Sequence, residues 1–315
     1  MRRLAASIAL LTLVSVSGGE SGELIVPELG PEVELASWDA DDPETEGIMA
    51  EGLSPNGEIL AYLVTYKGDT YLMMKRLWKR GRAVRVGRLR GRYVTSRRLQ
   101  QGFSCDGRYA FFYEVRVGRN NNDVWTLGLV DLRKMERVRV LVKGALRVTA
   151  LFHRSRPEAY LLWKPNENEK AKLQRYDLKT GATETLVEKT DADVLLLSPN
   201  GNRLALVGEG ETKACLYRLH PFKKECELDL PEPPDGDGDN VTFMPEGARL
   251  LAGKEGSMVV VDASGATEPA EIKRLVETQN LRGNLVRMQQ APCGMILLTF
   301  RRWCVSDRTF LWPSK

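Results

Sequence analysis

Leu53-Ser54-Pro55-Asn56-Gly57 opens a pattern that decides the fold of this chain, because closely related segments return along it at a steady interval. The further copies are Phe103–Gly107, Leu197–Gly201, Phe243–Gly247 and the weaker Ala291–Gly294. Proline, then Asn or Asp, then glycine is typical of a tight turn, since proline presets one φ angle and glycine supplies a positive one. Each copy therefore predicts a short hairpin connection.

The spacing of the copies predicts the architecture. Their glycines lie 50, 94, 46 and 47 residues apart. Because 94 is twice 47, we expect one further copy near Leu151–Pro157, ahead of the strand-like Ala159–Trp163. Each turn is followed by an apolar strand-like run such as Ile59–Val64. A period in the forties with several short strands per repeat is typical of a propeller. The sequence predicts an all-β fold, a six-bladed β-propeller with four antiparallel strands per blade.

The residues of the repeat also resemble a known family. The Ser-Pro-Asn-Gly turn, the following strand Ile59–Val64 and the later turn Asp177-Leu178-Lys179-Thr180-Gly181 are similar to the TolB-type propeller repeat, a relative of the WD repeat. This repeat also occurs in the propellers of prolyl oligopeptidase relatives. The resemblance covers residues 46 to 312 and implies a stand-alone propeller without a hydrolase domain. It further implies an interaction platform, since propellers of this family commonly bind partners.

The first residues predict an exported protein. Leu4–Val16 is an apolar run behind Arg2 and Arg3, a pattern typical of a secretory signal peptide, which we expect over residues 1–19. The run is too short to cross a bilayer as a helix. An uncleaved membrane anchor is the alternative. We expect a periplasmic or secreted protein whose mature chain has no transmembrane span.

The last repeat lacks a strand, and the N-terminal segment is expected to supply it. Residues 20–45 precede the propeller, which we place at residues 46–315. Either Glu32–Ser37 or Glu23–Val26 has the strand-like character needed to pair with the open edge. Natural sheets avoid leaving such an edge bare. The last blade is therefore predicted to be closed by an N-terminal strand.

Basic residues gather in one stretch, although the net charge of the chain indicates no class of partner. The formal net charge is +4, and it falls to +2 without Arg2 and Arg3. Between Lys75 and Arg98 the chain has eleven basic residues and no acidic one, with a central group of Arg82, Arg85, Arg88, Arg90 and Arg92. One interpretation is docking on an anionic surface. The other is a solvated outer strand whose charges prevent edge pairing. Nucleic acid is not expected, because the leader exports the chain.

An acidic loop offers a candidate calcium site. Asp235, Asp237 and Asp239 alternate with glycines, and oxygen ligands at alternate positions suit Ca²⁺. The match to a calcium loop is imperfect, because Asn240 stands where glycine is required at the sixth position. The alternative is a solvated acidic loop that binds no cofactor.

Two cysteines are placed symmetrically about a predicted hairpin tip. Cys215 and Cys226 are equidistant from His220-Pro221, so their side chains are expected to face each other across two strands, within reach of a disulfide. The alternative is a pair of free thiols.

The sequence assigns no catalytic residue. It contains no Gly-x-Ser-x-Gly motif, and its two histidines, His153 and His220, fall at predicted turns, where we expect exposed surface residues. The function expected is an exported, non-catalytic platform for a protein or envelope component. The alternative is a calcium-assisted hydrolase of lactonase or esterase type.

The expected partner-binding surface lies at one mouth of the ring. Loops that leave the same end of successive blades share one face, and an exposed aromatic with arginines suits partner recognition. The residues placed there are Asn121, Asn122, Asp123, Glu209, Arg301, Arg302 and Trp303.

Overall fold

The fold is known from a computed structural model, in which all regular secondary structure of the described residues is β-strand. No helix among those residues has the length and apolar character needed to cross a membrane. The chain divides into two compact units, Met1–Gly144 and Ala145–Lys315, which are considered separately below. The described residues are 3–11, 29–39, 45–66, 68–76, 83–90, 102–118, 122–208, 210–234, 240–244, 246–254, 257–267, 285–290, 296–301 and 307–312.

The first unit holds a two-stranded and a seven-stranded sheet. In the small sheet β1 (Arg3–Leu11) pairs antiparallel with β2 (Leu29–Asp39). The large sheet runs in chain order, and a single parallel bridge between β6 and β7 separates four strands from three. Its strands are β3 (Thr45–Leu53), β4 (Ile59–Tyr66), β5 (Asp69–Arg76), β6 (Val84–Arg90), β7 (Tyr109–Val117), β8 (Asp123–Asp131) and β9 (Glu136–Ala145).

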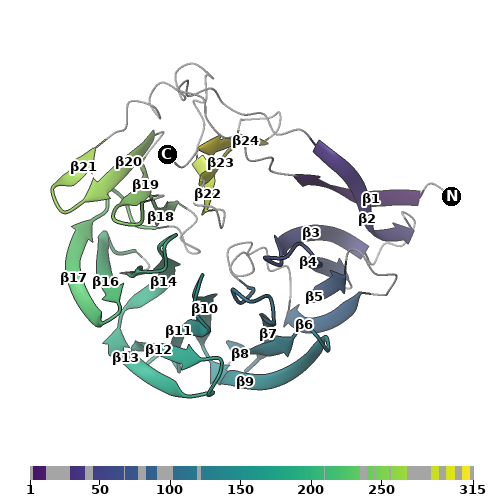
Figure 1. The fold of residues 1–315 in the computed structure, drawn as a ribbon, viewed down its shortest axis with the longest axis horizontal. Coiled ribbons are helices and arrows are strands. Elements are labelled where there is room, and N and C mark those ends of the chain that lie inside the picture. The colour runs from purple at the N-terminus through teal and green to yellow at the C-terminus, as the bar shows by residue number, and fades with distance from the viewer. Residues whose placement is uncertain are drawn as a thin grey trace. The chain divides into compact units, whose positions relative to one another are not determined.

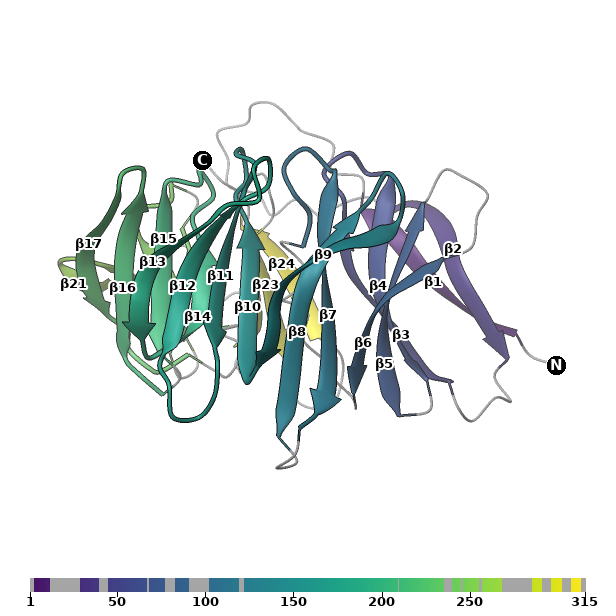
Figure 2. The ribbon, with the colours of Figure 1, turned by 90° about the horizontal axis from the view of Figure 1, so that it is seen from below.

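The second unit holds three four-stranded antiparallel sheets and one of three strands, each in chain order. The first strands of successive sheets, β10, β14, β18 and β22, contact one another in turn (Figure 1). Within each sheet, neighbouring strands run side by side in alternating directions (Figure 2). The strands are β10 (Arg147–Phe152), β11 (Glu158–Lys164), β12 (Ala171–Asp177), β13 (Thr183–Thr190), β14 (Ala192–Leu197), β15 (Arg203–Gly208), β16 (Lys213–Leu219), β17 (Phe222–Asp229), β18 (Val241–Phe243), β19 (Leu250–Lys254), β20 (Ser257–Asp262), β21 (Gly265–Thr267), β22 (Leu285–Gln290), β23 (Ile296–Arg301) and β24 (Asp307–Trp312).

The core of the second unit lies between neighbouring sheets, which explains the continuous apolar runs of the inner strands. Strands β11 and β15 are buried on both faces, whereas the outer strands β13 and β17 are largely exposed. One apolar cluster packs β10–β13 against β14–β17, and a second packs β14–β17 against β18–β21. A strand covered on both faces has no room for alternating polar residues.

The repeated turn has the conformation that its sequence predicts. In the first copy the Ser54 N–H donates to the Ile59 oxygen at 2.8 Å, and the Gly57 N–H donates to the Ser54 oxygen at 2.8 Å. The φ angle of Gly57 is +69°, in the left-handed region that glycine adopts at low cost. The expected hidden copy is confirmed, because His153 N–H donates to the Glu158 oxygen at 2.8 Å and starts the β10–β11 hairpin.

Four-stranded antiparallel sheets are therefore confirmed, while the number of blades and the closure remain predictions. The candidate closing strand Glu32–Ser37 lies in β2, which pairs with β1. Within the described residues, β24 pairs with β23 alone, in a sheet of three strands. Residues Arg3–Leu11 of the expected leader form β1. Cleavage of the leader is likewise a prediction.

Candidate functional site

Most of the predicted partner-binding residues lie outside the described part of the chain. Asn121, Glu209, Arg302 and Trp303 are among these, and Arg301 is described only as the last residue of β23. Asn122 is exposed beside the β7–β8 loop, and Asp123 is half-buried at the start of β8. Whether these residues share one mouth stays a prediction.

The candidate calcium ligands Asp235, Asp237 and Asp239 also lie outside the described residues. Among the residues that are described, no group of three His, Cys, Asp or Glu side chains is placed to hold a metal ion. Calcium binding by the acidic loop thus remains a prediction.

Two arginines of the basic stretch make contacts within their own sheet. Arg88 of β6 donates from Nε to Oδ2 of Asp69 at 3.0 Å, and this carboxylate raises the pKa of Arg88. The Arg85 guanidinium lies 5.3 Å from the centre of the Tyr71 ring. Arg85 and Arg88 are both exposed, and docking of this stretch on an anionic surface stays a prediction. Arg82 and Arg92 lie outside the described residues, as does the side chain of Arg90.

The prediction that Cys215 and Cys226 face each other is wrong. Both are free thiols, and Cys226 is opposite Leu216 while Cys215 is opposite Glu227. Cys215 packs against the cluster shared with β10–β13, and Cys226 packs against the cluster shared with β18–β21. The two thiols therefore point to opposite faces of one sheet.

A bulge in the hairpin is the physical reason. The pairing is symmetric about the turn as far as Tyr217 opposite Lys224, and the register then shifts by one residue. Because side chains alternate between faces, one extra residue turns every later side chain of that strand to the other face. The symmetric placement about His220-Pro221 correctly puts the two cysteines on paired strands, but it predicts the wrong face of the sheet for one of them.

We expect reduction to leave the stability of this hairpin unchanged. Mass-spectrometric mapping of the unreduced protein, alkylated after unfolding, should find both Cys215 and Cys226 as modified thiols. A peptide that links the two cysteines would contradict the assignment. In a variant that retains only these two cysteines, a drop in melting temperature on adding dithiothreitol would also contradict it, since a disulfide contributes about 2–4 kcal/mol to stability.

The two histidines meet inside the second unit, so the prediction that both are exposed turn residues is wrong. His153 is only 2% exposed, and the side chain of His220 is 23% exposed. Their ring centres lie 5.9 Å apart, and the His153 ring lies 6.3 Å from that of Tyr160. The β10–β11 turn and the β16–β17 turn lie at the same end of two adjacent sheets, and this brings the two rings together.

Backbone groups hold the His153 ring on both nitrogens. The N–H groups of Ser155 and Arg156 both donate to Nδ1 at 3.1 Å. Nδ1 therefore carries no proton, and Nε2–H donates to the Gly201 oxygen at 2.8 Å. Burial lowers the pKa of His153. The neutral ring thus joins the β10–β11 turn to the β14–β15 turn of the next sheet.

Glu158 lies between the second histidine and a buried tyrosine. The Tyr160 hydroxyl donates to Oε2 of Glu158 at 3.0 Å, and the His220 Nε2 lies 3.5 Å from the same oxygen. Burial lowers the pKa of His220, against the opposing effect of Glu158, and burial also raises the pKa of Tyr160. We call His153, Glu158, Tyr160 and His220 the histidine cluster.

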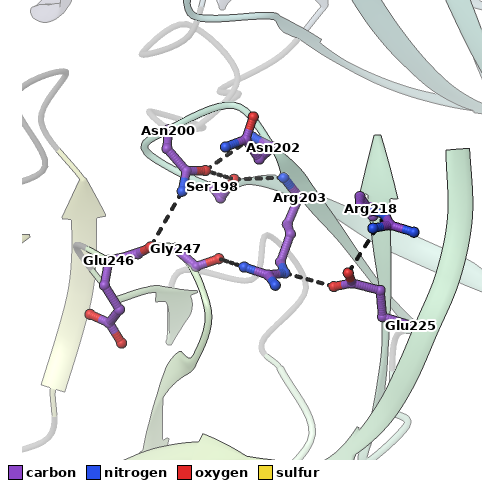
Figure 3. A network of polar contacts seen from close by, with 8 residues as sticks. All are labelled: Ser198, Asn200, Asn202, Arg203, Arg218, Glu225, Glu246 and Gly247. Atoms are coloured by element: carbon purple, nitrogen blue, oxygen red, sulfur yellow. Dashed lines mark hydrogen bonds and ion pairs between the residues drawn. The ribbon is translucent and has the colours of Figure 1, made fainter. Parts of the chain in front are cut away.

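A second polar network links the following pair of turns (Figure 3). The Ser198 hydroxyl donates to Oδ1 of Asn200 at 2.8 Å, and its oxygen accepts the Arg203 N–H at 2.9 Å. Asn200 Nδ2 then donates to the Glu246 oxygen at 3.3 Å, in the β18–β19 turn. Arg203 also donates from Nε to Oε2 of Glu225 at 2.6 Å. At this end of the unit, hydrogen bonds link the turns of neighbouring sheets.

The sequence contains a signal that would have found the role of His153. His153 stands 49 residues after Ser104 and 45 before Ser198, so it occupies the serine position of the repeated turn. Alignment of the turns by this position places its side chain where the turn serines form their hydrogen bonds. The position of His220 has no such signal, because it depends on how two sheets pack.

Comparison with solved structures identifies the fold. The β-propeller of the Trilobed protease from Pyrococcus furiosus, which has an open velcro topology, matches at 10% identity and a TM-score of 0.52. The match covers 86% of this chain and 81% of that chain. This chain has the β-propeller fold. No family model matches it, and no curated protein does.

Two further structural neighbours are longer proteins. The Pyrococcus horikoshii acylaminoacyl peptidase matches this propeller at 12% identity with a TM-score of 0.50, over 86% of this chain and 44% of its own. TolB from Acinetobacter baumannii matches at 15% identity with a TM-score of 0.44, over 69% of this chain and 51% of its own. This chain therefore matches about half of each. Its structural neighbours are TolB and acylaminoacyl peptidase propellers, and the assignment rests on structure alone.

Proposed function

We propose that this propeller is an exported, non-catalytic platform that binds a protein or cell-envelope partner. The observation that carries the proposal is that both histidines of the chain take part in contacts between turns. Both ring nitrogens of His153 are bonded to backbone groups, and the His220 ring faces Glu158 within the same cluster. A general base must be able to reach a substrate proton. These side chains support the packing of turns instead.

The end of the sheets opposite to the histidine cluster is the better candidate for contact with a partner. There the β11–β12 loop and the β13–β14 link carry exposed charged residues. Lys170 pairs with Asp191 at 2.6 Å, and Arg147 pairs with Asp193 at 3.0 Å. The first pair joins the β11–β12 loop to the β13–β14 link, and the second joins strands β10 and β14. The first pair restrains the loops before binding, which lowers the entropy that association would cost. Of the predicted residues, Asn122 belongs to a loop of the same kind, β7–β8, in the first unit, and Asp123 begins the strand that follows it.

A pair of variants tests this assignment of the binding end. The full chain is cross-linked in a cell-envelope extract, the captured partner is identified and purified, and its affinity is measured by calorimetry. We expect Arg302→Ala with Trp303→Ala to weaken binding by about 1,000-fold, because aromatic and arginine anchors each contribute about 2 kcal/mol or more. The control is Arg249→Ala. Arg249 is an exposed residue of the β18–β19 turn, at the same end as the histidine cluster, and this variant should bind as the unchanged chain does.

Two results would contradict the proposal. If Arg249→Ala abolishes binding and the loop variant does not, the partner uses the turn end. If purified chain carries stoichiometric calcium and hydrolyses lactones or esters, and Asp235→Asn removes both properties, the chain is a calcium-assisted hydrolase.

A further inference from the structure

One turn of the second unit carries an imidazole at a position where other copies of the turn carry a hydroxyl. The residues Ser54, Ser104, His153 and Ser198 all donate their backbone N–H to the carbonyl oxygen five residues later, at 2.8 to 2.9 Å. The four turns therefore share one hydrogen bond at one position. Three of them carry a hydroxyl there, and the fourth carries an imidazole, which takes up a proton near neutral pH. The Met244 turn has the same bond, to the Arg249 oxygen at 2.8 Å, and carries a thioether at this position.

Like the hydroxyl, the imidazole accepts backbone N–H groups of its own turn, although not the same ones, and it adds a contact to the next sheet. In the Ser198 turn the hydroxyl oxygen accepts a backbone N–H at 2.9 Å. In the His153 turn Nδ1 accepts two backbone N–H groups, while Nε2–H reaches the oxygen of Gly201. A proton on Nδ1 would face the two N–H groups of Ser155 and Arg156 with no acceptor between them. The charged ring is therefore incompatible with the closed turn.

Several titratable and charged side chains lie near the His153 ring. Glu158 of β11 favours the protonated ring, whereas His220 of the β16–β17 turn and Arg156 of its own turn oppose it. Tyr160 of β11 is hydrogen-bonded to Glu158, and Arg175 of β12 is paired with Glu184 of β13. The Glu158 carboxylate is thus shared between the Tyr160 hydroxyl and His220. Among the described residues, this is the carboxylate that favours protonation of either imidazole.

We propose that His153 is an acid-sensitive latch that joins the turns of two neighbouring sheets of the propeller and releases these turns when its ring takes a second proton. The latch consists of His153 and its bond to Gly201. In the closed state the buried neutral ring is favoured. In the open state the ring is solvated and titrates at its ordinary pKa of about 6.5. Protons therefore bind the open state more tightly, and acidification below about pH 6.5 shifts the equilibrium toward opening.

Hydrogen exchange of the full, untagged chain at several pH values tests the latch. Rates are corrected for the intrinsic pH dependence of exchange and followed in peptides that cover residues 149–163 and 198–206. We expect corrected exchange in both peptides to rise by up to about fivefold between pH 6.5 and 5.5, because one ring with an open-state pKa of about 6.5 is already half protonated at the upper pH. Peptides that cover the Ser54 and Ser104 turns serve as internal controls and should not change.

Two variants separate the latch from general loosening. His153→Ser introduces the residue of the sibling turns, and it should remove the pH dependence from both peptides. Asn200→Ala breaks the neighbouring bond from the Asn200 amide to the backbone oxygen of Glu246, and neither group in that bond titrates. This variant should therefore speed exchange there equally at every pH and leave the dependence on His153 intact.

The proposal is overturned if corrected exchange in the unchanged chain does not rise with acid, or if His153→Ser retains the rise. Should His153→Ser fail to fold, His220→Gln leaves a single imidazole whose protonation is followed by NMR. The latch requires this imidazole to titrate together with the exchange of residues 198–206. Titration without that coupling rejects it.

Discussion

Gly201→Ala is expected to destabilise the chain by about 3 kcal/mol, whereas Gly57→Ala, in the same turn position, should cost about 1 kcal/mol. Both glycines have positive φ angles, +71° and +69°, and an alanine in that conformation costs about 1 kcal/mol. At Gly57 a new Cβ would meet nothing within 4 Å. At Gly201 it would lie 2.6 Å from Cε1 of His153. That ring is held by three hydrogen bonds, so overpacking adds about 2 kcal/mol.

Urea denaturation followed by circular dichroism measures this difference directly. The two variants share the backbone cost, so their difference isolates the contact between the turn and the imidazole. Equal losses in the two variants would contradict the placement of His153 against Gly201. His153→Ser combined with Gly201→Ala should lose less than the two single variants together, because the serine leaves room for the new methyl group.

Phe243→Ala is expected to destabilise the chain by about 3–5 kcal/mol, the cost of removing a buried aromatic ring and leaving a cavity. Phe243 is fully buried in β18, opposite Leu250, in the cluster that packs β14–β17 against β18–β21. Turn hydrogen bonds at the same junction contribute only about 1 kcal/mol each. The packing of the two sheets therefore depends mainly on this cluster.

Phe243→Leu is the matched control, because it keeps much of the volume and all of the apolar character. We expect it to cost less than about 1.5 kcal/mol in the same denaturation experiment. If the alanine variant loses no more than the leucine variant, the ring does not fill the junction between the two sheets.

The repeated turns were predictable because they depend on local chemistry. Proline, Asn and glycine restrict the backbone at their own positions. The hidden copy at His153 has neither Asn nor glycine, and only the interval between the other copies predicts it. The continuous burial of β11 and β15 was predictable for the same reason, since an apolar run without alternation indicates a strand covered on both faces. Short stretches of sequence thus predict the repeat, the antiparallel sheets and the propeller fold.

The histidine cluster and the separation of the two cysteines were decided by the tertiary structure. One extra residue in β17 carries Cys226 to the face opposite to Cys215, and no residue type in that stretch marks the bulge. The bond from His153 to Gly201 joins residues 48 apart, and the burial of both rings depends on the neighbouring sheet. A sequence fixes the backbone preference of each turn within a few residues. Which side chain of that turn meets the next sheet depends on packing between distant segments, and only the folded chain determines it.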